Sequence, residues 1–119
     1  MENKLYILKN QQGEIICQKM LVANKLFDRL RGLMFSQELP NCDGFLIYPC
    51  NSIHTFFMLY SLDVLFLDKE FKVIQVKYNL RPWLMTWIYF KANQVLEMKA
   101  GSMKKGLVVG DKLEAICIN

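Results

Sequence analysis

Short apolar runs separated by turn residues are the feature of this sequence that most limits its fold. Each run has the length of a β-strand and is too short for a typical helix. The runs that favour strands are 3–9, 14–22, 44–48, 52–58, 63–67, 72–78, 94–99 and 112–118. Seven or eight short strands of this kind predict a small β-barrel or a strongly bent antiparallel sheet. The first two runs flank a turn at 10–13, which predicts an N-terminal hairpin over about 3–22.

One segment has helical periodicity instead. Residues 25–35 follow Asn24, a residue type that is favoured at the N-cap of a helix. The apolar residues of this segment fall on one stripe, which comprises Leu26, Phe27, Leu30, Leu33 and Met34. We therefore expect a mostly β (α+β) fold with one packed helix. The chain has 119 residues and no repeat or linker, so residues 1–119 are expected to form a single domain.

The charge pattern argues against nucleic acid as a partner. The formal net charge is only +4, although the segment 77–105 has six Lys or Arg residues and one acidic residue, Glu97. These cations are spread along the chain rather than clustered, which is typical of a solvated face. The start of the chain lacks the apolar run of a secretory signal, and the longest apolar run, 83–90, is too short for a membrane-spanning helix. We expect a cytoplasmic protein that is not transmembrane.

Four cysteines, Cys17, Cys42, Cys50 and Cys117, include no C-x-x-C pair, so free thiols are expected. Cys17 and Cys117 lie in apolar strand patterns, which favours core positions for both. No residue spacing indicates a metal site. A site assembled from His54, Cys50 or Cys42, and Asp63 or Asp68 stays open on ligand chemistry alone. We expect no metal and no cofactor.

His54 is the only histidine, and Cys50 precedes it by four residues. A Cys–His pair would need a bend in the chain, because four residues of extended strand span about 13 Å. A convergent polar cluster fits the pattern better. Arg29 and Arg31 flank the helical stripe, while His54, Thr55 and Asp63 lie on strands that are expected to be neighbours. Such a cluster suits a small anionic or hydrogen-bonding ligand, and the alternative is that Arg31 pairs with Asp63 or Asp68 to anchor the helix.

Residues 83–90 form an aromatic run that periodicity does not assign to a helix or a strand. Its rings either fill the core or form a docking surface for a protein, a membrane or stacked bases. The neighbouring Arg81-Pro82 pair and the polar residues after Phe90 favour partial exposure. The candidate interaction surface comprises Arg81, Trp83, Trp87 and Tyr89.

Several motifs occur in a specific order: 29–34 (RLRGLM), 54–58 (HTFFM), 63–68 (DVLFLD), 95–97 (VLE), 100–101 (AG) and 110–111 (GD). This pattern, from about residue 23 to 118, resembles the domain of unknown function 192 family, also called uncharacterised protein family 0127. The resemblance implies a compact β-barrel-like fold with one helix and no established activity. Many relatives resemble exported proteins, whereas this chain lacks a leader pattern.

Together these observations predict a non-enzymatic module that binds an unknown small ligand or a protein partner. The alternative is a small enzyme that uses His54 with a Cys or Asp partner. No glycine spacing matches a nucleotide-binding fingerprint.

Overall fold

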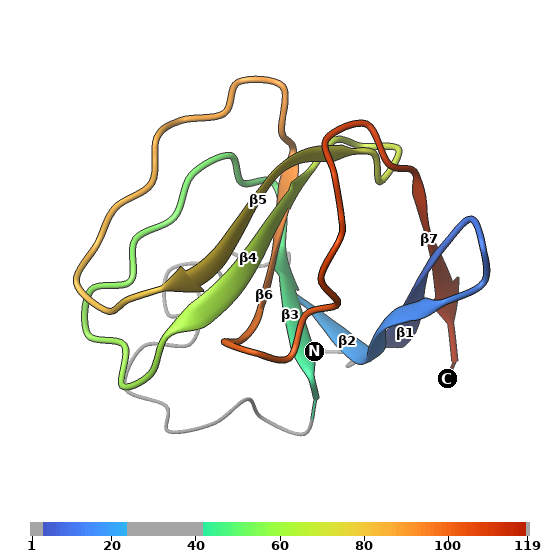
Figure 1. The fold of residues 1–119 in the computed structure, drawn as a ribbon, viewed down its shortest axis with the longest axis horizontal. Helices are drawn as coiled ribbons and strands as arrows, with labels where there is room; N and C mark the ends of the chain where they lie inside the picture. Colours follow the sequence, from blue (N-terminus) through green and yellow to red (C-terminus); the bar gives the residue numbers. More distant parts are fainter. Residues whose placement is uncertain (1–3, 24–41, 119) are drawn as a thin grey trace.

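The computed structural model describes residues 4–23 and 42–118, which form a mostly β structure (Figure 1). Its seven strands are β1 (Leu5–Asn10), β2 (Ile15–Ala23), β3 (Gly44–Ile47), β4 (Leu62–Leu67), β5 (Val73–Leu80), β6 (Gln94–Lys99) and β7 (Leu113–Cys117). No helix occurs within these described ranges, and none of them holds a helix that is long and apolar enough to cross a membrane. The helix predicted over 25–35 lies outside the described residues.

All seven strands belong to one sheet in the order β5-β4-β6-β3-β2-β1-β7. Most neighbours pair antiparallel, but β2 and β3 are parallel, with Met20 opposite Gly44 and Ala23 opposite Ile47. The prediction of an antiparallel sheet was therefore wrong for this pair. A parallel pair requires a crossover of a dozen or more residues, and the chain between Ala23 and Gly44 is long enough to supply one.

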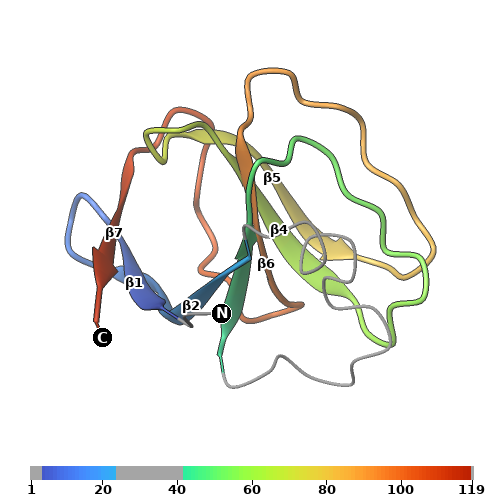
Figure 2. The same cartoon turned by 180° about the vertical axis from the view of Figure 1, so that it is seen from behind.

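The sheet curls into a half-barrel, as Figures 1 and 2 show from opposite sides. Its two edge strands, β5 and β7, approach each other where both begin. Val73 N donates to Asp111 O at 2.8 Å, and Leu113 N donates to Phe71 O at 2.9 Å. These backbone hydrogen bonds join the two edge strands at one end of the sheet. They therefore help to hold the sheet in its curled shape.

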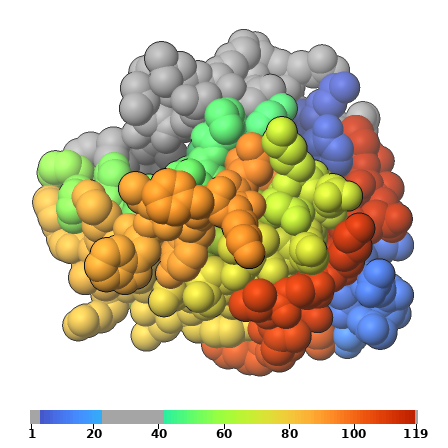
Figure 3. Space-filling model, turned by 90° about the horizontal axis from the view of Figure 1, so that it is seen from above, coloured from blue at the N-terminus to red at the C-terminus, as the bar shows by residue number. Residues whose placement is uncertain are grey.

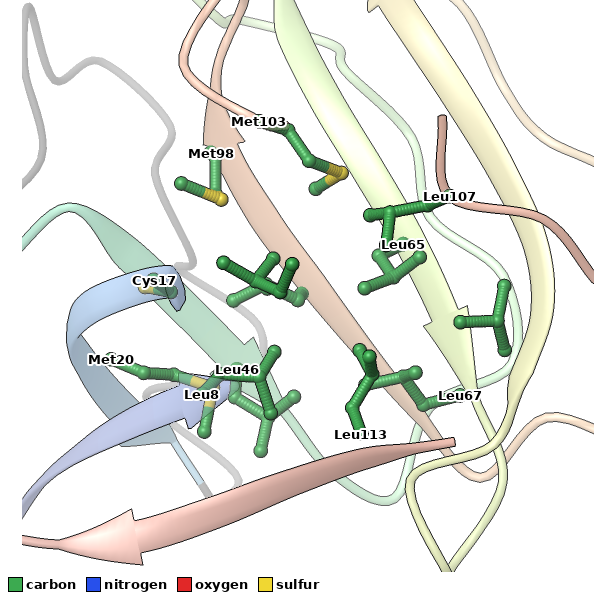
Figure 4. Packing of buried hydrophobic residues seen from close by; sticks show 13 residues of the cluster. Leu8, Cys17, Met20, Leu46, Leu65, Leu67, Met98, Met103, Leu107 and Leu113 are labelled. Atoms are coloured by element: carbon green, nitrogen blue, oxygen red, sulfur yellow. The ribbon is translucent and has the colours of Figure 1, made fainter. Parts of the chain in front are cut away.

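The two faces of the sheet hold separate apolar clusters. The inner cluster fills the curl and includes Leu8, Leu65 and Met98 (Figure 4). The outer cluster includes Phe45, Val64 and Phe66 on the opposite face. Every residue of β4 is buried, which confirms the prediction that this run is a central strand covered on both sides.

Two long loops lie side by side next to the outer cluster, one from 48 to 61 and the other from 81 to 93 (Figures 1 and 2). The predicted strand over 52–58 is absent, apart from a single bridge between His54 and Met85. Aromatic and β-branched residues favour strands because they suit a half-buried pleated surface. Here the same residue types form paired loops, so composition alone gave the wrong element.

The cysteines divide between core and surface. Cys17 is buried in the inner cluster as predicted, whereas the core position predicted for Cys117 was wrong because its side chain is exposed. Cys117 is the last residue of β7, an edge strand whose final two residues, Ile116 and Cys117, are both exposed although they point to opposite faces. All four cysteines are unbridged thiols, which confirms that prediction.

Candidate functional site

The two paired loops present a continuous set of apolar side chains to solvent. Trp83, Trp87 and Phe90 are 59%, 81% and 84% exposed. We call the whole set the aromatic surface; it comprises Phe57, Leu59, Trp83, Leu84, Met85, Trp87, Ile88 and Phe90. In Figure 3 the orange side chains of the second loop lie beside the green ones of the first. The exposure predicted for Trp83 and Trp87 is confirmed, and large contiguous apolar patches of this kind mark interaction sites.

Backbone hydrogen bonds hold the two loops together. Thr55 N donates to Leu84 O at 2.7 Å, Thr86 N to Ile53 O at 2.9 Å, and Tyr89 N to Asn51 O at 2.9 Å. These bonds satisfy backbone groups that would otherwise be free in irregular segments. The aromatic surface is therefore mounted on an ordered scaffold.

Thr55 is the central side chain of this scaffold and is completely buried. Its Oγ1 donates to Arg81 O at 2.6 Å and accepts from Leu84 N at 2.9 Å. The residue that was predicted to bind a ligand thus bridges the two loops. Its hydroxyl uses both a donor and an acceptor in doing so.

His54 is exposed and belongs to a cluster of rings on the aromatic surface. Its ring stacks on Phe56 at a centroid distance of 4.8 Å, and Phe56 lies 5.9 Å from Trp83. The imidazole Nδ1 accepts from Phe56 N at 3.2 Å. Half-buried Cys50 donates its thiol to Ser52 O at 3.1 Å, so the thiol proton is directed at that carbonyl and not at His54.

Backbone strain occurs at two residues of the aromatic surface. Phe57 and Trp83 have φ values of 65° and 67°, and their rings meet edge-on at 4.7 Å. A left-handed conformation costs a residue with a side chain about 1–2 kcal/mol. Both rings remain largely exposed, at 44% and 59%, despite this cost.

Asp63 lies apart from this cluster on β4 and is completely buried. Its Oδ1 accepts from Asn79 N at 2.9 Å, and its Oδ2 accepts from Gly101 N at 2.9 Å and Met103 N at 3.2 Å. These three backbone donors tie the turn after β6 to β4 and β5. Arg29 and Arg31, the other members of the predicted cluster, lie outside the described residues.

Arg81 and Lys91 are exposed near the two ends of the 81–93 loop. Tyr89, the remaining candidate, is half-buried against the outer cluster, and its ring lies 4.6 Å from Phe66. Tyr89 therefore anchors the loop to the sheet while its neighbours Ile88 and Phe90 face outward. In the described part of the chain, no three His, Cys, Asp or Glu side chains are grouped so as to hold a metal ion.

Glu97 is a notable residue that sequence reasoning did not select as a site. It is 4% exposed and pairs across the sheet with Phe45 on one side and Val64 on the other, both in the outer cluster. Burial raises the pKa of this carboxyl from 4.5 to about 8. The sequence did contain a signal for this position. Leu96 and Met98 face the inner cluster, so alternation along β6 places Glu97 on the opposite, outer face.

The burial of Glu97 changes the electrostatics of the neighbouring surface. Glu97 is the only acidic residue in 77–105, and with this pKa it is largely uncharged at neutral pH. The basic residues of the segment, including Arg81 and Lys91 beside the aromatic surface, therefore have no ionised acid within it to offset them. This stretch of chain is more basic on the folded protein than the sequence count indicates.

Comparisons with known proteins identify the family. The family model DUF192, described as Uncharacterized ACR, COG1430, matches residues 7–115. A UPF0127 protein of Pyrococcus abyssi is 47% identical over 104 residues, which cover 82% of this chain and 86% of the relative. Another UPF0127 protein, of Pyrococcus horikoshii, is 35% identical over 100 residues, or 78% of this chain and 84% of the relative. The family resemblance expected from the motifs is confirmed.

Two solved structures share the fold. A Sinorhizobium meliloti protein that is suggested to be a transcription regulator has a TM-score of 0.76 and 23% identity, covering 96% of this chain and 94% of that one. A Novosphingobium aromaticivorans protein of unknown function has a TM-score of 0.72 and 21% identity, covering 92% and 83%. At these identities the likeness concerns the fold alone.

Proposed function

The chain belongs to the DUF192 family of uncharacterised proteins, and from that premise we propose that it is a non-enzymatic module that docks on an anionic membrane surface. The observation that carries this proposal is the aromatic surface, with exposed Arg81 and Lys91 at the two ends of its main loop. Tryptophan is favoured at the boundary between lipid and water, and Lys and Arg are attracted to anionic headgroups.

The energies of these groups are sufficient for reversible docking. Full burial of one large apolar side chain is worth about 1.5–3 kcal/mol, and each cation near an anionic lipid surface adds about 1 kcal/mol. Partial insertion of Trp87, Ile88 and Phe90 with two cations supplies about 6 kcal/mol. This corresponds to a dissociation constant of roughly tens of micromolar.

The form of the surface favours a membrane over a protein partner. Trp87, Ile88 and Phe90 are consecutive or nearly so on an irregular loop, and all three are exposed. A fluid headgroup layer can surround such a loop, whereas a protein interface core needs close shape complementarity. The cytoplasmic location predicted from the sequence is consistent with this partner, because the cytoplasmic leaflet carries the anionic lipids.

An enzyme that uses His54 has less support. The Cys50 thiol and the Asp63 carboxylate each bond to backbone groups elsewhere. His54 instead stacks on Phe56 at the edge of the aromatic surface. A ring in that position can contribute to docking at a headgroup layer without any catalytic partner.

Vesicle flotation with intrinsic fluorescence tests the proposal. Trp83 and Trp87 are the only tryptophans, so the emission reports on the aromatic surface alone. We expect binding and a blue shift with vesicles of phosphatidylcholine and phosphatidylserine, and much weaker binding to phosphatidylcholine alone. Trp87→Ala with Phe90→Ala should weaken binding about a hundredfold, because about 3 kcal/mol of apolar insertion is lost.

A matched control is available on another loop. Val108 and Val109 are also exposed apolar residues, and replacing both with alanine should leave vesicle binding unchanged. The proposal is overturned if the wild-type protein does not float with anionic vesicles. It is equally overturned if the two alanine pairs weaken binding to the same extent.

A further inference from the structure

A hollow of about 300 Å³ opens on the inner side of the half-barrel. Its floor is formed by Met20 on β2 and Leu46 on β3, both buried members of the inner cluster. Three aromatic side chains line it, Tyr6, Tyr48 and Phe71. The hollow lies on the sheet face opposite the outer cluster, so it is separate from the aromatic surface and does not depend on the function proposed above.

Among the described residues that line the hollow, Gln94 alone has an amide side chain, and it is only 5% exposed. Its Nε2 donates to the backbone oxygen of Asp68 at 2.9 Å. Because a carbonyl oxygen only accepts, this bond fixes which end of the amide is the NH₂ group. Oε1 is left as an oriented acceptor, and within the described part of the chain the structure records no donor for it.

Side-chain hydrogen bonds of Asp68 stabilise the turn beside the hollow. Asp68 Oδ1 accepts from Glu70 N at 2.8 Å and from Lys72 N at 2.9 Å. Phe71, the last aromatic wall, has a φ of 63° and is locked by the hydrogen bond from Leu113 N to its carbonyl oxygen. The same turn therefore positions both the Phe71 ring and the carbonyl of Asp68 that orients Gln94.

We propose that this hollow binds a small, neutral, planar molecule with one N–H or O–H donor directed at Gln94 Oε1. None of the described residues that line the hollow is charged, which favours an uncharged ligand. Aromatic walls on an aliphatic floor favour a flat ring, and the oriented acceptor of Gln94 selects a molecule with a donor at one position. A ligand that covers Gln94 Oε1 without offering a donor leaves this acceptor unsatisfied at a cost in free energy, so a molecule of the same shape without the donor is discriminated against.

Indole and 1-methylindole form a matched pair of probes, because the methyl group replaces the one N–H donor. We would titrate each into the isotope-labelled wild-type protein and follow the amide and methyl resonances by NMR. Indole is expected to shift the side-chain NH₂ signals of Gln94 and the methyl signal of Ala115, which also lines the hollow. Its affinity should exceed that of 1-methylindole by about tenfold, as the loss of one hydrogen bond predicts.

Two variants of adjacent residues on β7 test the location. Ala115→Leu should fill the hollow and abolish indole binding, whereas Ile116→Leu changes an exposed neighbour on the other face and should leave it intact. The comparison of the two probes on the wild-type protein tests the proposal even if the Ala115→Leu variant does not fold. Equal affinity for the two probes, no binding of either, or shifts confined to the two tryptophans would each overturn the proposal.

Discussion

At the scale of single residues, the carboxyl of Glu97 makes the stability of the fold depend on pH. Burial between Phe45 and Val64 raises its pKa from 4.5 to about 8, so the folded chain holds a proton that the unfolded chain releases between these two values. Stability falls with rising pH wherever the folded state binds more protons. The free energy of unfolding should therefore decrease by up to about 1.4 kcal/mol per pH unit across this window and level off above pH 8.

Glu97→Gln removes the ionisable group while it keeps the shape. Urea unfolding of this variant should show a flatter pH profile than the wild type and a higher stability at neutral and alkaline pH. Glu114→Gln, an exposed glutamate on β7, is the control and should retain the wild-type slope. Identical slopes for wild type and Glu97→Gln would refute this account of the buried carboxyl.

The residue scale is also where prediction from the sequence was weakest. The pattern placed Thr55 and Asp63 in one convergent cluster for a small ligand, and it did not anticipate the backbone groups that each of them bonds. In the structure Thr55 bonds to Arg81 and Leu84, and Asp63 bonds to three backbone amides. Alternation along a strand predicts which face a side chain takes, but it does not predict which backbone groups turns bring to it.

At the scale of elements, Gly44 permits the close parallel pairing of β2 and β3. A Cβ at this position would clash with Cys17 Sγ and would come within 3.0 Å of Leu96 Cδ1. Gly44→Ala should therefore lower the free energy of unfolding by about 1–3 kcal/mol. Cys17→Ala removes the clashing atom, so the double variant should lose at least about 0.5 kcal/mol less than the sum of the two single losses.

Cys17→Ser is the matched control for this cycle, because its Oγ occupies nearly the same place as the sulfur. It should rescue Gly44→Ala much less than Cys17→Ala does. Chemical denaturation of six proteins, the wild type, the three single variants and the two double variants, measures every term. Strict additivity of Gly44→Ala and Cys17→Ala would show that the contact with Cys17 does not set the requirement for glycine.

Strands were predicted well where their residues are buried by the sheet itself. β6 occupies 94–99 as expected, and β4 (Leu62–Leu67) contains the whole run 63–67 that was predicted to be central. The loops of 48–61 and 81–93 could not be predicted from residue propensity, for a physical reason. Their aromatic and β-branched residues have strand propensity, but their backbone bonds run between the two loops and leave several side chains in solvent.

At the scale of the whole molecule, the half-barrel separates an inner core from an outer one, and the two proposed binding surfaces lie on opposite faces of the sheet. The docking surface consists of loops on the outer face. The hollow consists of strand residues and the turn at Phe71 on the inner face. The candidate site anticipated from the sequence included the aromatic run but not the hollow, because β2, β3 and β7 come together only through the curl and the parallel pair.

The cysteines range from buried to exposed, so the rates at which their thiols are labelled report whether the fold unfolds cooperatively. Cys117 is exposed, whereas Cys17 is buried in the inner cluster (Figure 4). The Cys17 thiol donates to Asp43 Oδ1 at 3.0 Å. Burial raises the pKa of the Cys17 thiol, and it raises that of Cys42 to about 11. We expect Cys117 to react first with a disulfide reagent at mildly alkaline pH and Cys17 last. If the fold opens as one unit, the protection of Cys17 equals the free energy of global unfolding from urea titration. A free energy of opening from Cys17 labelling that is well below the global value would mean that the inner face opens separately. The two faces of the sheet would then unfold as independent units.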